Sequence, residues 1–175
     1  MGKYQIPDKL TDFRAYNESN DMLGVVDIDL PSFEAETDEI KGAGLAGTLD
    51  TPALGQHKSM TVGLNFRAPT DNSLGLLAPK VHRLALYGSI QHFDGGKGEI
   101  IEVPCRIYAH GLPKKKEMGK FESAKQTGTK VEFELTYIKI TLDGKDKVEV
   151  DKLNYIFAVD GKDYLAAVRV NLGLG

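Results

Sequence analysis

The stretch from Lys130 to Leu142, KVEFELTYIKITL, constrains the fold more than any other part of the sequence. In its first half, apolar residues at positions 131, 133 and 135 alternate with Glu132, Glu134 and Thr136. Because successive side chains of a β-strand leave opposite faces, this alternation predicts a half-buried strand. At Tyr137–Ile138 the alternation shifts by one residue, which predicts a β-bulge or a sharp bend. A strand of about 12 residues is roughly twice the usual length, which indicates a sheet that serves more than one monomer's core.

Further strands are predicted on both sides of this stretch. Residues 81–93 and 99–109 alternate in the same way around a glycine-rich turn, which predicts a long hairpin. Residues 12–16 and 22–30 predict a shorter strand pair, and residues 58–67 predict one more strand. The basic run Lys114–Lys116 falls in a segment expected to be a solvated loop through Gly128.

Two short helices complete the expected elements. One covers residues 71–78 with Thr70 as its N-cap, and the other covers residues 164–172 with Asp163 as its N-cap. Because strands and helices do not alternate, we expect an all-β, mainly antiparallel sandwich or partly open barrel with a short middle helix and a C-terminal helix. The side chains expected in its core are Val131, Phe133, Leu135, Tyr155 or Ile156, Phe157, Leu165, Val168 and Leu172.

Composition sets the outer limits of this interpretation. The chain has 175 residues, 27% of them charged, and a net charge of −3, which fits a single domain over residues 1–175 with a sizeable core. Cys105 is the only cysteine, so neither an internal disulfide nor a cysteine-rich zinc site can form. The polar N-terminus and the absence of a long apolar run predict synthesis in a cytoplasm without membrane insertion.

The segment Ser32–Lys58 is rich in glycine, proline, threonine and acidic residues and keeps no sustained period. Long segments of this kind in a compact domain are usually functional. Its residues 42–47 spell G-x-G-x-x-G, but acidic residues precede the pattern and Pro52 follows where a dinucleotide site needs a helix. We therefore expect no cofactor, and we expect the glycines to let a loop bend closely against a neighbouring backbone.

No chemistry-bearing pattern stands out in the sequence. The four histidines lack ligand spacing, and neither a nucleophile elbow nor a phosphate-binding loop occurs, so we expect no metal site and no catalytic residue. Tyr87 and Tyr108 are aromatic candidates for nucleic-acid binding, but the acidic neighbours Glu99 and Glu102 argue against it. Two alternatives stay open: a monomeric ligand- or carbohydrate-binding β-sandwich, and a hydrolase whose carboxylates meet only on folding.

The run from Val150 through Leu174, VDKLNYIFAVDGKDYLAAVRVNLGL, resembles the end of the major tail tube proteins of contractile-tailed, P2-like phages. Residues 42–55, 78–82 and 9–13 are similar as well, so the resemblance covers nearly the whole chain in order. The resemblance implies a structural virion protein, not an enzyme. It also implies six-fold rings that stack into a hollow tube, as in related R-type bacteriocins and type VI-like injection systems.

The same resemblance implies partners and surfaces. The partners are further copies of the chain, the tail sheath, a baseplate or tube initiator and a tape measure protein, with DNA or effectors passing through the lumen. It gives Ser32–Lys58 a role as an arm that contacts the next subunit or ring. The candidate contact residues of the arm are Glu39, Gly42, Gly44, Leu45, Gly47, Leu49 and Leu54.

Alternation along the organising strand gives candidates for the channel wall. If its sheet lines the channel, the face opposite the core presents Glu132, Glu134 and Thr136. Each glutamate is then repeated around the ring, and the resulting negative field repels DNA phosphates. The alternative is that these residues face outer solvent or the sheath.

Overall fold

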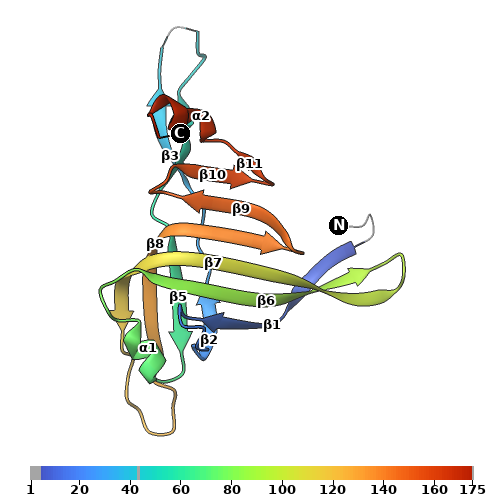
Figure 1. Ribbon diagram of the computed structural model, residues 1–175, viewed down its shortest axis with the longest axis vertical. Helices are drawn as coiled ribbons and strands as arrows, with labels where there is room; N and C mark the ends of the chain where they lie inside the picture. The colour runs from blue at the N-terminus through green and yellow to red at the C-terminus, as the bar shows by residue number, and fades with distance from the viewer. Residues whose placement is uncertain (1–4, 43, 175) are drawn as a thin grey trace.

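The computed structural model describes residues 5–42 and 44–174, and its strands form two layers that cross (Figure 1). The elements are, in chain order, β1 (Gln5–Tyr16), β2 (Val25–Asp29), β3 (Ala35–Ile40), β4 (Leu49–His57), β5 (Thr61–Phe66), α1 (Asp71–Gly75), β6 (His82–Asp94), β7 (Glu99–Glu117), β8 (Thr129–Leu142), β9 (Lys145–Asp151), β10 (Ile156–Val159), β11 (Lys162–Asp163) and α2 (Ala166–Asn171). Neighbouring strands pair antiparallel throughout the described part of the chain. The expected all-β, partly open fold with two short helices is confirmed.

The front sheet has the strand order β1-β6-β7-β8-β9-β10-β11, and its long strands run across the view in Figure 1. The predicted long hairpin is present as β6 and β7, which pair from His82–Gly111 to Asp94–Glu99. Within the described residues, β1 at one edge pairs with β6 and otherwise makes a single isolated bridge, Tyr16–Met22, and β11 at the other edge pairs with β10 alone. The front sheet is therefore open at both edges.

The shift in alternation within β8 is a β-bulge at Thr136. On β7, His110 lies opposite Tyr137 and Gly111 lies opposite Leu135, so Thr136 is the extra residue. The first half of β8 pairs with β5 in the back layer, and the second half pairs with β9 in the front sheet. The bulge thus lets one strand pass from one layer to the other.

The core fills the space between the two layers. Its best-buried side chains come from β5 and the first half of β8 on one side and from β6, β7 and the second half of β8 on the other. They include Met60, Val62, Leu64, Phe66, Leu84, Leu86, Ile107, Val131, Phe133, Leu135 and Ile138. The burial of Val131, Phe133 and Leu135 was expected from the alternation and is confirmed. Thr70 caps α1 as predicted, in a capping box with Ser73.

Two strand predictions are wrong. Residues 12–16 and 22–30 do not form a strand pair, because β2 pairs with β5 in the back layer and only the bridge Tyr16–Met22 joins it to β1. Lys114–Lys116 belongs to β7 and not to a loop. The first half of β8 gives this end of β7 a partner, and Lys115 lies opposite Glu132, a favourable cross-strand pair.

The C-terminal helix is shorter and less buried than the sequence predicts. Asp163 accepts a hydrogen bond from the Leu165 backbone N–H at 2.9 Å, but the helix begins only at Ala166. Leu165 is buried, Val168 is half-buried and Leu172 is 54% exposed. The buried Leu165 is the N-cap of this six-residue helix, and none of the residues within the helix is buried, so the predicted buried stripe is confirmed only at Leu165.

At the start of β10 the expected core is confirmed in part, because Phe157 packs against it. Tyr155 is 38% exposed and has φ of +53°, while Ile156 and Phe157 are half-buried. The turn that ends at Tyr155 directs its ring away from the core. Neither helix in the described ranges is long and apolar enough to cross a bilayer.

Candidate functional site

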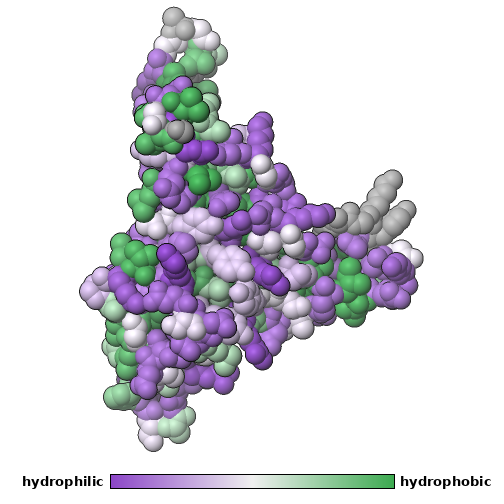
Figure 2. Space-filling model, in the orientation of Figure 1, coloured by the Kyte–Doolittle hydropathy of each residue, from purple (hydrophilic) through white to green (hydrophobic). Residues whose placement is uncertain are grey.

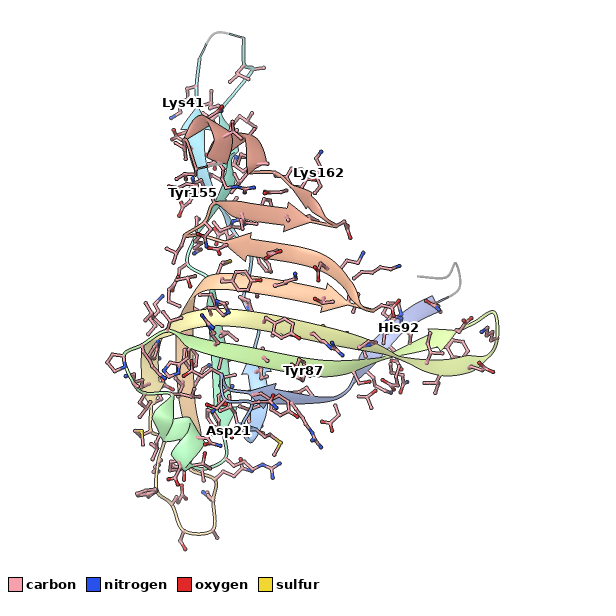
Figure 3. All side chains as sticks on the ribbon, viewed as in Figure 1. Asp21, Lys41, Tyr87, His92, Tyr155 and Lys162 are labelled. Atoms are coloured by element: carbon pink, nitrogen blue, oxygen red, sulfur yellow. The ribbon has the colours of Figure 1, made fainter. Side chains whose placement is uncertain are left out.

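The segment Ser32–Lys58 forms a hairpin, β3–β4, that projects from one end of the molecule (Figure 1). In the part of the chain that the structure describes, the two strands pair with each other alone, from Ala35–His57 to Ile40–Leu49. Almost all of their residues outside the root are exposed. We call residues 34–50 the arm; Lys41 in Figure 3 marks its outer end. The sequence indicated a long segment without a sustained period here and did not reveal its two strands.

The root of the arm is held by aromatic and ionic contacts. The ring of His57 lies 4.8 Å from that of Phe157 on β10 and 6.3 Å from that of Phe33. Lys58 Nζ lies 2.5 Å from a carboxylate oxygen of Glu34. Burial lowers the pKa of His57, and the nearby ammonium of Lys152 lowers it further, so this ring is mainly neutral at pH 7 and packs as an aromatic residue.

Gly55 fixes how the root meets α2. It has φ of +65°, and a Cβ built there would lie 2.6 Å from the Leu165 side chain. The three atoms nearest to that Cβ all belong to this leucine, so β4 and the start of α2 are in direct contact at this glycine. The arm therefore projects from a fixed base, although its outer half has no neighbour in the subunit among the described residues.

Six of the seven predicted contact residues lie near the outer end of the arm, whereas Leu54 lies close to its root. Gly42, Gly44 and Gly47 are in the turn between β3 and β4, and all three have positive φ; Ala43 of the same turn lies outside the described residues. The G-x-G-x-x-G pattern thus joins two antiparallel strands, and the element that follows it is β4. Glu39 pairs with Lys41 at 2.9 Å. Three exposed leucines complete the set: Leu45, Leu49 and Leu54.

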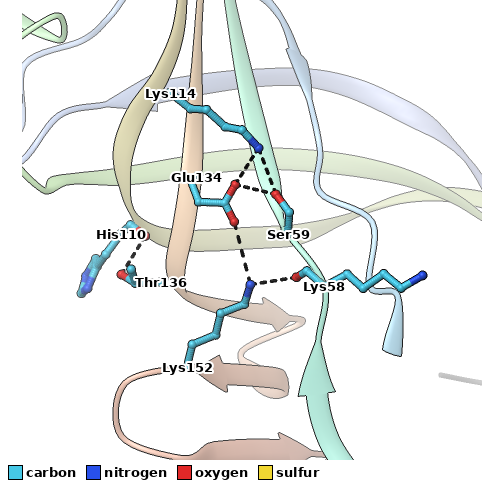
Figure 4. A network of polar contacts seen from close by, with 7 residues as sticks. All are labelled: Lys58, Ser59, His110, Lys114, Glu134, Thr136 and Lys152. Carbon is cyan, nitrogen blue, oxygen red and sulfur yellow. Dashed lines mark hydrogen bonds and ion pairs between the residues drawn. The ribbon is translucent and has the colours of Figure 1, made fainter. Parts of the chain in front are cut away.

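Glu134 is the centre of a polar network on the outer face of the back layer (Figure 4). Its carboxylate accepts hydrogen bonds from Ser59 Oγ at 2.5 Å and Lys114 Nζ at 3.0 Å, and Lys152 Nζ lies 3.9 Å away. Burial alone would raise the pKa of Glu134, but these donors outweigh it and the pKa is lowered. The lysines balance the charge of this glutamate locally.

The other two channel candidates lie on the same face of β8. Glu132 is half-exposed opposite Lys115, and Thr136 Oγ1 donates to the His110 carbonyl oxygen at 3.3 Å. The expected alternation is confirmed, since all three side chains point away from the core that Val131 and Phe133 enter. No observation tests whether this face lines a channel, and that assignment stays a prediction.

A second polar face lies on the front sheet (Figure 2). Tyr16, Tyr87 and Tyr108 come from three neighbouring strands, with ring centroids 5.4 Å and 6.1 Å apart. The guanidinium of Arg106 lies 5.7 Å from the centroid of the Tyr87 ring, and Figure 3 labels Tyr87 on this face. The sequence indicated Tyr87 and Tyr108 as two separate aromatic candidates. It did not predict that their rings are neighbours, because the register between two strands is set by the fold.

The same face continues across the second half of β8 onto β9. There Lys139 pairs with Asp146 at 2.8 Å, and Tyr137 donates to Glu149 at 3.0 Å. The front face therefore carries charges of both signs. No group of three or more histidine, cysteine or acidic side chains suited to a metal ion occurs within residues 5–42 and 44–174.

An apolar groove of about 460 Å³ lies between β1 and β2. The floor of the groove is formed by β6 and β7, on the face of these strands that points toward the core. The back layer does not cover this part of the two strands, and Ile90 and Cys105 lie here. Partial burial raises the pKa of the Cys105 thiol, and this half-buried side chain lines the groove.

The sequence of the chain matches one protein family and is similar to two phage proteins. Residues 7–173 match the model of the family described as phage tail tube protein FII. The chain is 30% identical to the tail tube protein of Escherichia phage P2, over 97% of this chain and 99% of the relative. It is 29% identical to the major tail tube protein of Serratia phage KSP20, over 97% and 98%.

A solved structure shows the same fold. It is a chain of an extracellular contractile injection system, the PVC sheath/tube terminator in its extended state, which matches with a TM-score of 0.51 at 11% identity over 77% of this chain and 96% of that one. The family match and the two phage relatives together identify a structural protein of the virion and not an enzyme. The chain belongs to the phage tail tube protein FII family, the tail tube proteins of contractile-tailed phages.

Proposed function

We propose that six copies of this chain close into a ring and that the rings stack into a hollow tube, the conduit for DNA or effectors in a contractile tail. The observation that carries the proposal is the front sheet, which is open at β1 and at β11. Unpaired strand edges favour pairing with other chains, and the edge at β1 is 12 residues long whereas the edge at β11 has two. Joining the sheets of several copies into one barrel removes these edges.

The front face is the better candidate for the channel wall. It is polar, it crosses the subunit from β1 to β10, and its strands are among the longest in the chain. The face that carries Glu132, Glu134 and Thr136 belongs to the back layer and is the alternative wall predicted from the sequence. If the front face lines the channel, the back layer faces outward and offers its surface to the tail sheath.

The ends of the tube would meet the remaining partners. A tube that grows by stacking needs a baseplate or tube initiator at one end, and a tape measure protein inside the channel would set its length. We propose both as partners by their role in tail assembly.

A monomeric ligand-binding β-sandwich is the second candidate function. The groove between β1 and β2 favours it, because apolar concave sites of a few hundred Å³ hold small molecules in many proteins. An assembled tube would instead use or cover such a surface at a contact between copies.

The experiment compares the intact chain with a variant lacking residues 42–47. This deletion removes the arm's turn but keeps the ladder from Ile40–Leu49 to Ala35–His57. We expect the intact chain to form rings with six-fold averages and tubes in negative-stain micrographs, and the deletion variant to stay a folded monomer in size-exclusion chromatography. A wild-type chain that stays monomeric over a wide concentration range contradicts the tube function. Normal tubes from the deletion variant contradict the role of the arm.

A further inference from the structure

The two ends of the subunit's long axis carry opposite charge. The arm lies at one end, and the connection from β7 to β8 lies at the other end (Figure 1). From Glu34 to Asp50, the arm has five acidic residues and one lysine. From Lys114 to Lys130, the other end has six lysines and two glutamates. We call residues 114–130 the basic end.

We propose that the arm of one copy packs against the basic end of the next copy in the same ring. The proposal rests on the ring function above and names the surface that receives the arm. The partner that binds this surface is a second copy of this chain.

The strand order indicates that this contact runs around the ring. Strands of a barrel lie side by side around its circumference, so in a wall made of front sheets the order from β1 to β11 follows the ring. The arm lies toward β11, and the basic end lies toward β1 (Figure 1). Each arm therefore faces the basic end of its neighbour, and such a head-to-tail contact can close into a ring.

Both surfaces have apolar residues among their charges. Phe121 in the basic end is 90% exposed, and Met118 near it is 49% exposed. On the arm, Leu45 and Leu49 are 43% and 54% exposed. An apolar centre within a charged rim is the usual anatomy of a protein–protein contact, and aromatic residues often dominate its free energy.

Part of the charge on each surface is available for a partner. Three lysines of the basic end are already paired within the subunit: Lys114 with Glu134, Lys115 with Glu117 and Lys130 with Asp29. Neither Glu36 nor Asp38 of the arm forms an ion pair with another residue in the described part of the subunit. In the basic end, Lys120 and Lys125 both pair with Glu122, at 3.7 Å and 2.5 Å. Exposed pairs of this kind contribute little to stability, so the lysines can exchange Glu122 for carboxylates of another copy.

Charge reversal on each surface tests the contact. The first variant combines Glu36→Lys with Asp38→Lys, and the second combines Lys120→Glu with Lys125→Glu. We expect each variant alone to associate at least tenfold more weakly than wild type at low salt, measured by analytical ultracentrifugation, because like charges then meet. High salt should weaken the association of the wild type and reduce the difference in association between wild type and the two variants.

Mixing the two variants gives the decisive result. The reversed, basic arm of the first variant then meets the reversed, acidic 114–130 surface of the second variant. The native acidic arm of the second variant meets the native basic end of the first variant. Both contacts are attractive, so alternating copies should form rings again. A control matched to the second variant, Lys97→Glu with Lys145→Glu, makes the same change of charge in the β6–β7 turn and at the start of β9, away from both ends, and should form rings like wild type. Circular dichroism confirms folding of each variant, and neutral versions (Glu36→Gln with Asp38→Asn, Lys120→Gln with Lys125→Gln) should show intermediate losses.

Two outcomes overturn the inference. Either both reversed variants form rings like wild type at low salt, or the mixture stays as weak as its components. In both cases wild-type rings leave the tube function intact. If the wild type forms no rings, the proposed function itself fails.

Discussion

At the scale of single residues, Glu134 ties three parts of the chain together. Its carboxylate accepts hydrogen bonds from Ser59, just before β5, and from Lys114 on β7, and Lys152 approaches it from the segment after β9. Lys152 in turn donates to the Lys58 carbonyl oxygen at 2.8 Å. The carboxylate thus links the back layer, the arm root and the front sheet near the bulge (Figure 4).

Glu134→Gln keeps the shape of this side chain and removes its charge. We expect the variant to lose about 1–2 kcal/mol of unfolding free energy at pH 7, since hydrogen bonds to charged groups are stronger than neutral ones. The folded-state pKa of Glu134 is lowered by these donors from its ordinary 4.5. Its contribution is therefore complete above pH 4.5 and is lost as the pH falls through the lower, folded-state pKa.

Urea unfolding at pH 7 and at pH 3 measures this difference. The gap between wild type and Glu134→Gln should be smaller at the lower pH. Glu132→Gln on the same face is the matched control and should change stability little, because no hydrogen bond to its carboxylate is described. An equal loss from Glu134→Gln at both pH values would show that packing, not charge, explains the effect.

At the scale of elements, the sequence predicted what is local and missed what depends on the partner. The alternation of β8 predicted its faces and the bulge, because pleat and burial are properties of one strand. It could not show that the two halves of β8 join different layers, since β5 and β9 lie on opposite sides of it in the sequence. For the same reason, the end of β7 at Lys114–Lys116 looked like a loop until its partner was known.

The helix α2 shows the same limit. Helical spacing placed Leu165, Val168 and Leu172 on one stripe, but how far a short helix stays in contact with the sheet is set by tertiary packing. The candidate arm was found from its lack of period and its glycines. Its acidic character was visible in the sequence, whereas its position opposite the basic end was not.

Leu165 should carry most of the stability that α2 contributes. Leu165→Asp places an unpaired charge against Gly55 and the arm root, and we expect a loss of about 3–5 kcal/mol of unfolding free energy. Leu172→Asp, at an exposed position of the same segment, should cost less than about 0.5 kcal/mol. Thermal or urea unfolding of the two variants checks the difference, and similar losses would contradict the observed docking of the helix.

At the scale of the whole molecule, the question is which of the two outer faces lines the channel. Thr141→Lys adds a cation to the front face beside Arg106, where the lysine can pair with Asp146. If the front face is the wall, phage particles built from this variant should release DNA more slowly at low salt, and high salt should restore the rate. Glu132→Lys, on the back layer, should leave DNA release unchanged.

The opposite pattern has a clear meaning. Slow, salt-sensitive release from Glu132→Lys with normal release from Thr141→Lys would place Glu132, Glu134 and Thr136 on the channel wall. Glu132 is a better test position than Glu134, because substituting Glu134 also breaks the network that ties the layers together.

The bulge at Thr136 also has a consequence for the gene. The two halves of β8 are joined by one residue more than a regular ladder needs. The number of residues in this stretch, and not only their identity, therefore decides how β8 passes from one layer to the other. A substitution at one codon here alters one side chain. Loss of the codon for Thr136 would leave a regular strand that keeps Tyr137 outward and Ile138 inward but lacks the bulge through which β8 passes from one layer to the other. At the bulge, the number of residues is thus more tightly constrained than the type of residue.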